Sequence, residues 1–132
     1  MFTEMTAPEG FTPEAVEAYL KAHPRRMYVP CSGAHCIVAE YLTYYHTNTE
    51  RTSTGLDFSF LYGPDHAETG QSVRLRNPER IKNLICWFDG YWDKPISGFD
   101  VAAQMSDFYN SELPLEIEPP TAASEKGGDA TD

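Results

Sequence analysis

The sequence predicts an α+β fold in which about four helices pack on a small antiparallel β-hairpin or sheet. Three observations lead to this prediction. Apolar residues recur at helical spacing behind capping residues, one segment alternates with the period of a strand, and the composition after residue 109 turns to Pro, Ala, Gly, Ser and acids. We expect a flexible lead at 1–10, one compact α+β domain at 11–109 and a disordered acidic tail at 110–132.

The first helix is expected to begin after Thr12, which is a good N-cap, with Pro13 in the first helical position. His23-Pro24 ends it, because the residue before a proline is disfavoured in the α conformation. The segment 25–30 that follows is short and partly apolar, and it is interpreted as a short strand.

A second helix is expected from Ser32, acting as the N-cap, to about Tyr45. Its apolar stripe consists of Val38, Tyr41, Leu42 and Tyr45. With this cap, Cys31 and Cys36 would occupy positions whose side chains meet across the cap, so oxidation should join them in a disulfide bond. The polar segment 47–55 is rich in Thr and Ser and is expected to be a loop.

A β-hairpin is expected over 56–76. Its first strand alternates, and the residues that share one face are Leu56, Phe58, Phe60 and Tyr62. Gly63-Pro64-Asp65 interrupts the pattern. The partner strand, 71–76, places Arg74 and Arg76 on one side and apolar residues on the other.

The third helix is expected to begin at Asn77-Pro78-Glu79 and to stop at Gly90, a residue that commonly terminates helices. A fourth helix is expected after Ser97, whose hydroxyl can cap it, and its apolar side reaches Tyr109.

The formal net charge is −10. Residues 1–109 hold nine Lys and Arg against fourteen Asp and Glu, and residues 110–132 hold one Lys against six acids, so each part contributes −5. This balance argues against direct nucleic-acid binding and against anionic membrane surfaces. No run of about 20 apolar residues and no signal peptide is found, and three cysteines is an odd number for a disulfide framework, so we expect a cytoplasmic protein.

Cys31, His35 and Cys36 are of the residue types that bind zinc, and Cys86 or His46 could complete a set of four. The spacing does not match known zinc motifs. Cys36 near a helix start could also be a nucleophile, but no Cys/His signature accompanies it. Buried, unreactive cysteines are the preferred interpretation, and we assign no catalytic residue and expect no cofactor.

One basic cluster stands out, and it consists of Arg74, Arg76, Arg80 and Lys82. Beside the helix start at Asn77, these cations could clamp a phosphate, a carboxylate or an acidic partner segment. The alternative is a solvated surface that balances nearby acids.

Aromatic residues make up 13% of the chain, which is more than one small core easily buries. Tyr44 falls outside the apolar stripe of the second helix and should face outward. Exposed Tyr and Trp residues dominate the binding energy of protein interfaces, so Tyr44, Tyr91 and Trp92 are candidate docking residues.

These observations favour a small intracellular, non-enzymatic regulatory module that docks on a protein partner. Accessory proteins of bacteria or phages have this profile, which is an analogy of class only. One alternative is an acidic nucleic-acid mimic that inhibits a nucleic-acid-binding protein. A further alternative is a thiol- or metal-dependent protein that uses Cys31, His35 and Cys36. The sequence does not indicate an oligomeric state.

Overall fold

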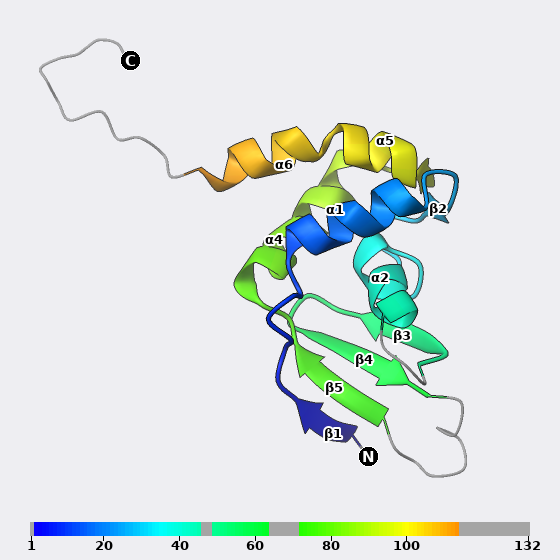
Figure 1. Cartoon of the computed structure of the whole chain (residues 1–132), viewed down its shortest axis with the longest axis vertical. Helices are drawn as coiled ribbons and strands as arrows, with labels where there is room; N and C mark the ends of the chain where they lie inside the picture. Colours follow the sequence, from blue (N-terminus) through cyan, green and yellow to red (C-terminus); the bar gives the residue numbers. More distant parts are fainter. Residues whose placement is uncertain (1, 46–48, 64–71, 114–132) are drawn as a thin grey trace, which may run out of the picture.

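The computed structural model describes residues 2–45, 49–63 and 72–113, and over these it has an α+β fold with five helices and two sheets. The helices are α1 (Pro13–Ala22), α2 (Ile37–Tyr45), α4 (Glu79–Tyr91), α5 (Gly98–Ala103) and α6 (Met105–Glu112). The strands are β1 (Phe2–Met5), β2 (Met27–Tyr28), β3 (Arg51–Thr54), β4 (Phe58–Tyr62), β5 (Ser72–Arg76) and β6 (Ile96–Ser97). The larger sheet lies at one end of the molecule, α1, α5 and α6 lie at the other, and α2 lies between them (Figure 1).

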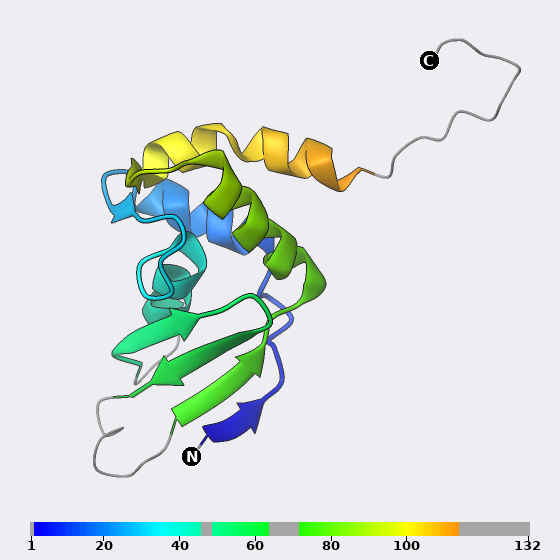
Figure 2. The same ribbon diagram turned by 180° about the vertical axis from the view of Figure 1, so that it is seen from behind.

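The larger sheet is mixed and has the order β1-β5-β4-β3. Strand β4 is antiparallel to both of its neighbours, whereas β1 joins β5 in parallel. The predicted hairpin is confirmed, because β4 and β5 pair from Phe58 opposite Arg76 to Tyr62 opposite Ser72. In both views the helices lie above the larger sheet and none is drawn below it (Figure 2). Within the described part of the chain, one face of this sheet therefore carries no helical layer.

Three strands lie where the sequence predicted none, and one of them is the two-residue β6, just before the fourth predicted helix. Strand β1 belongs to the segment expected to be a flexible lead, and β3 belongs to the segment expected to be a loop. In β3 the polar residues Thr52 and Thr54 are buried, and the Thr43 hydroxyl donates a hydrogen bond of 2.9 Å to the Thr52 hydroxyl. Such polar strands are stabilised by pairing with a neighbouring strand, which a local hydrophobic pattern does not reveal.

The capping residues of two helices are confirmed. The Thr12 hydroxyl accepts a hydrogen bond of 3.2 Å from the amide of Ala15 at the start of α1. The Ser97 hydroxyl accepts one of 3.1 Å from the amide of Asp100 at the start of α5. Both side chains satisfy backbone donors that the helix itself leaves unpaired.

The predicted cap of the second helix is wrong. The Ser32 hydroxyl does accept the amide of His35, at 3.1 Å, but this closes a separate turn, and α2 begins only at Ile37. Cys36 instead precedes the helix, and its carbonyl accepts the amide of Glu40. Cys31 adopts a left-handed conformation with φ of 61°. The cap geometry on which a Cys31–Cys36 disulfide was predicted is therefore absent.

Three helix boundaries also differ from the prediction. Helix α4 continues through Gly90 to Tyr91, and the single helix predicted after Ser97 is divided at Gln104 into α5 and α6. Gln104 has φ of −103° and ψ of 3°, which turns the chain while keeping the apolar sides of both helices against the core. Helix α6 reaches Glu112, so the first residues assigned to the tail are helical, and 114–132 lie outside the described residues.

A single cluster of buried residues fills the space between the sheet and the helices. The inner face of the sheet contributes Leu61 and Leu75, and α4 contributes apolar residues one and two turns apart, among them Leu84 and Phe88. Phe108 of α6 closes the cluster from the opposite end.

The second sheet is a short antiparallel pair of β2 and β6, and it leads directly into α5 at Gly98. The chain passes very close to α1 at this point. A Cβ atom on Gly98 would lie 2.6 Å from the carbonyl oxygen of His23 and 3.0 Å from that of Leu20. Only glycine allows this approach between the start of α5 and the end of α1.

We predict that Gly98→Ala lowers the free energy of unfolding by about 1–3 kcal/mol, because the added methyl group meets backbone that cannot yield. The matched control is Gly90→Ala, where a Cβ atom meets nothing within 4 Å inside a helix. That change should raise the free energy of unfolding by about 0.5–1 kcal/mol. Urea denaturation of the three proteins measures both values, and equal effects of the two changes would contradict the close approach at Gly98.

Candidate functional site

The predicted basic cluster is divided among different surfaces. Arg80 lies on α4, away from the sheet, and its side chain connects three helices. Its guanidinium donates to both carboxylate oxygens of Glu14, at 2.9 and 2.7 Å, and to both of Glu112, at 2.7 Å each. These hydrogen bonds, to Glu112 first, raise the pKa of Arg80, and the hydrogen bond from Arg80 lowers the pKa of Glu14. Arg80 therefore links α4 to α1 and α6, and its donors are occupied.

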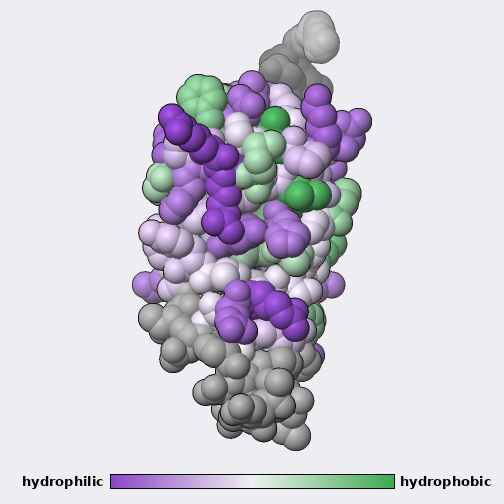
Figure 3. Space-filling model, turned by 90° about the vertical axis from the view of Figure 1, so that its right-hand side faces the viewer, coloured by the Kyte–Doolittle hydropathy of each residue, from purple (hydrophilic) through white to green (hydrophobic). Residues whose placement is uncertain are grey.

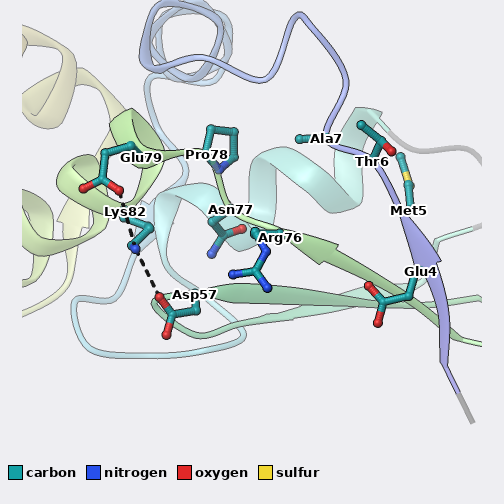
Figure 4. Close-up of a pocket in the computed structure, with 10 residues that line it drawn as sticks. All are labelled: Glu4, Met5, Thr6, Ala7, Asp57, Arg76, Asn77, Pro78, Glu79 and Lys82. Carbon is teal, nitrogen blue, oxygen red and sulfur yellow. Dashed lines mark ion pairs between the residues drawn. The ribbon is translucent and has the colours of Figure 1, made fainter.

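Lys82 is also paired locally. Its ammonium lies 3.2 Å from Asp57 and 3.5 Å from Glu79, and the hydrogen bond to Asp57 raises its pKa. Both ion pairs are visible in Figure 4, at one end of a hollow of about 690 Å³ that Arg76 also lines. Glu4 lies on the same hollow, so three carboxylates face two cations there. This balance does not favour the predicted clamp for an anion at the start of α4.

Arg74 and Arg76 point outward from β5, as the sequence predicted. Arg74 pairs with Glu4 of the neighbouring strand, and the guanidinium carbons of Arg74 and Arg76 both lie 4.7 Å from the ring centre of Phe58. Arg51, on β3, lies 4.1 Å from the ring centre of Tyr62. The sequence analysis missed Arg51, because only the pairing of β3 with β4 places it on this face.

The alternating aromatic residues of β4 also face outward. The inward positions of this strand are Ser59 and Leu61, which are buried against the helices. Phe58, Phe60 and Tyr62 are half-buried on the opposite side. The alternation in the sequence therefore marks the outer face of the sheet.

A second concentration of aromatic rings lies where α1 and α2 meet. We call Tyr19, His23, Tyr41, Tyr44 and Tyr45 the tyrosine surface. Ring centres lie 4.6 Å apart for Tyr19 and His23, 4.7 Å for His23 and Tyr44, 4.8 Å for Tyr44 and Tyr45, and 4.7 Å for Tyr41 and Tyr45. Tyr44 is 59% exposed and Tyr45 is 53% exposed. Tyr44 faces outward, as predicted, whereas Tyr45, which was assigned to the apolar stripe, is also exposed.

A hollow of about 240 Å³ borders the tyrosine surface, and it is lined by Pro8, Gly10, Phe11, Tyr41, Leu42 and Tyr45. The rings of Phe11 and Tyr41 stack with their centres 5.9 Å apart. The side of the molecule seen in Figure 3 shows hydrophobic residues in small areas separated by hydrophilic ones. Tyr44 and Tyr45 add exposed ring area beside the hollow.

Tyr91 and Trp92, the other candidate docking residues, are involved in packing between α4 and α6. The Tyr91 hydroxyl lies 2.8 Å from an Asp107 carboxylate oxygen and donates to it, which raises the pKa of the phenol. The Trp92 ring is half-buried, with its centre 5.6 Å from that of Phe88. Among the described residues no ring contact joins this pair to the tyrosine surface, so the three predicted docking residues are not brought together.

The three cysteines line one hollow of about 580 Å³, although they differ in environment. Cys31 and Cys86 are exposed, and the Cys31 amide donates a hydrogen bond of 2.8 Å to the Asp89 carboxylate. Cys36 is buried, and burial raises the pKa of its thiol to about 11. His35 turns away to pair with Glu40 at 3.2 Å. Within the described part of the chain no group of three or more His, Cys, Asp or Glu residues is arranged to hold a metal ion.

Comparison with known proteins gave no match to a family model, to a curated protein or to a solved structure. Among the described helices, none is both long enough and apolar enough to cross a membrane.

We predict that Arg80→Gln lowers the free energy of unfolding by about 1 kcal/mol at neutral pH, because the linked carboxylates lose their partner. The pKa of Glu14 is lowered from 4.5 in the folded protein, so its contribution is present above that value and is lost as the pH falls through the lowered pKa. Urea denaturation across pH should show wild type and variant converging as the pH falls below 4.5 and through the lowered pKa of Glu14.

Lys21→Gln, which removes a simpler pair with Glu17 along α1, is the control and should cost less than about 0.5 kcal/mol. If the free energy of unfolding of Arg80→Gln is still lower than that of wild type by the same amount at about pH 2, then Arg80 stabilises the fold through the packing of its aliphatic stem and not through its ion pairs.

We further predict that iodoacetamide at about pH 8 modifies Cys31 and Cys86 but spares Cys36 until the protein is unfolded. The thiolate is the reacting form, and both burial and the raised pKa suppress it at Cys36. Mass spectrometry of digested protein measures each site. Modification of Cys36 at the rate of the other two in folded protein would contradict its burial.

Proposed function

We propose that the protein is a non-enzymatic binding module that docks on a protein partner through the tyrosine surface. The observation that carries this proposal is the exposure of Tyr44 and Tyr45 on top of a connected set of rings. Tyrosine is enriched at binding hot spots because one side chain offers large apolar area together with a hydrogen-bonding hydroxyl.

The ring contacts support the proposal because they restrict the exposed side chains before a partner arrives. Tyr44 lies against both Tyr19 and His23, and Tyr45 lies against Tyr41. Tyr19 is buried in the core, so the surface rests on a rigid base. Side chains that are already ordered lose little conformational entropy on binding, and this improves affinity.

The adjoining hollow supports the same proposal. It provides a recess of about 240 Å³ next to the exposed edge of Tyr45. An apolar side chain of a partner segment could enter this recess while Tyr44 and Tyr45 pack against the flanking residues. The proposal includes no catalytic step and no cofactor, and it places the module in the intracellular regulatory class.

We predict that the double change Tyr44→Ala with Tyr45→Ala weakens partner binding by about 30-fold or more while leaving the fold intact, because both rings are largely exposed. The partner would be captured from cells on immobilised wild-type protein, identified by mass spectrometry, purified and titrated by calorimetry against both proteins. Thermal unfolding monitors the fold.

Phe99→Ala is the matched control, since Phe99 is a 66% exposed aromatic residue on α5, outside the tyrosine surface. Equal losses for Phe99→Ala and the tyrosine double change would contradict a localised docking surface. Binding that falls steeply with added salt, and is indifferent to the tyrosines, would favour the acidic mimic of nucleic acid instead.

A further inference from the structure

The outer face of the larger sheet places an arginine opposite each aromatic residue of β4. Arg76 lies opposite Phe58 and Arg74 opposite Phe60 on β5, and Arg51 lies opposite Tyr62 on β3. We call these six residues the arginine–aromatic face: Arg51, Phe58, Phe60, Tyr62, Arg74 and Arg76. Cations therefore flank the central aromatic strand on both sides.

The guanidinium groups lie over aromatic rings, and Arg51 and Arg76 remain exposed to solvent. Two of them share the ring of Phe58, at 4.7 Å each, and Arg51 lies 4.1 Å from the ring centre of Tyr62. The rings of Phe58 and Phe60 are 6.4 Å apart. Phe60 and Tyr62 also have further interactions, so Phe58 and the three arginines are the main groups that this face offers to a ligand.

The charge of this face is opposite to that of the chain. Three arginines against Glu4, the partner of Arg74, leave a net charge of +2, whereas the whole chain carries −10. Arg51 and Arg76 form no ion pair within the described residues, and the Arg74 Nε has no hydrogen-bond acceptor there. Glu4, Asp57 and Glu79 border the hollow that Arg76 lines and offset part of its charge, so the cations of this face without an ion pair among the described residues are Arg51 and Arg76.

We propose that the arginine–aromatic face binds single-stranded nucleic acid. Unpaired bases would stack on the Phe58 ring and on the guanidinium planes, and phosphates would pair with Arg51, Arg74 and Arg76. Aromatic rings and arginines on a sheet provide the two interactions that single strands use, which are stacking of base faces and neutralisation of the backbone.

The observations favour this ligand over two others. A duplex keeps the faces of its bases inside the stack, so the rings would contribute nothing to binding it. An acidic peptide would satisfy the arginines, but its carboxylate side chains carry no ring to stack on Phe58. The acidic body repels any polyanion, so a ligand that adds stacking to charge is the one that this face can retain.

The test is a fluorescence-anisotropy titration of the full chain with a labelled oligothymidylate of about 12 nucleotides. With three arginine–phosphate contacts, log K should fall with log salt with a slope of about −2, which is about 20-fold between about 50 and 200 mM salt. Phe58→Leu keeps an apolar residue but removes the stacking ring. It should weaken binding about 5-fold or more with an unchanged slope.

Arg76→Gln should instead weaken binding and reduce the slope by about 0.7. Arg80→Gln removes the same charge from the helical side of the molecule and should leave both values unchanged. Tyr44→Ala with Tyr45→Ala should also bind normally, so this proposal and the proposed protein docking can fail separately. Far-UV circular dichroism checks that each variant is folded.

Absence of saturable binding at low salt would overturn the proposal, as would Phe58→Leu and Arg76→Gln proteins that bind like wild type. A duplex of the same length that binds more tightly than the single strand would also overturn it. If polyglutamate displaces the oligonucleotide as well as an unlabelled strand does, and Phe58→Leu has no effect, then the face is a site for acidic peptides and the nucleic-acid proposal is wrong.

Discussion

The buried amide of Asn77 ties the junction of β5 and α4 to the hairpin of β3 and β4. It donates to the carbonyl oxygens of Gly55 and Leu56, at 2.9 and 3.0 Å, and it accepts the Ser59 hydroxyl at 2.7 Å. The backbone amide of Asn77 donates to the carbonyl of Asp57 at 2.8 Å. One residue at the junction of β5 and α4 thereby secures the turn between β3 and β4. Leaving these buried groups unpaired would cost about 1–3 kcal/mol for each group, so the register of the sheet and the start of α4 are set together.

Local signals in the sequence predicted the structure correctly where a side chain hydrogen-bonds to a backbone group a few residues away. Thr12 and Ser97 were predicted as caps and act as caps, because their partners lie three residues away. Strands β1 and β3 could not be predicted in this way. Strand β1 has no alternating apolar pattern and forms by pairing with β5, a distant part of the chain, whereas β3 is polar and pairs with β4 across a short turn. The start of α2 was also missed. Ser32 caps only a short turn, and the carbonyl of Gly33 in that turn accepts a hydrogen bond from the amide of Thr54 in β3.

The candidate sites show the same limit. Arg74, Arg76, Arg80 and Lys82 are close in sequence, but the chain passes from strand to helix at Asn77 and sends them to different surfaces. Arg51 is distant in sequence yet shares a face with the first two. The outward position of Tyr44 was predicted, because a helical period determines it. Its contacts with Tyr19 and His23 were not, because they depend on how α1 crosses α2.

The net charge of the chain describes its surfaces poorly, because charge is distributed unevenly over them. Within the helical layer the acids are used in structural links, such as Glu14 and Glu112 with Arg80 and Glu17 with the hydroxyl of Tyr109. On the sheet, arginines lie over rings and retain their charge. At physiological ionic strength charges are screened beyond about 8 Å, so a ligand on the outer face responds mainly to the local arginines. The remaining repulsion from the acidic body opposes every polyanion equally, and discrimination among them must therefore come from stacking on Phe58.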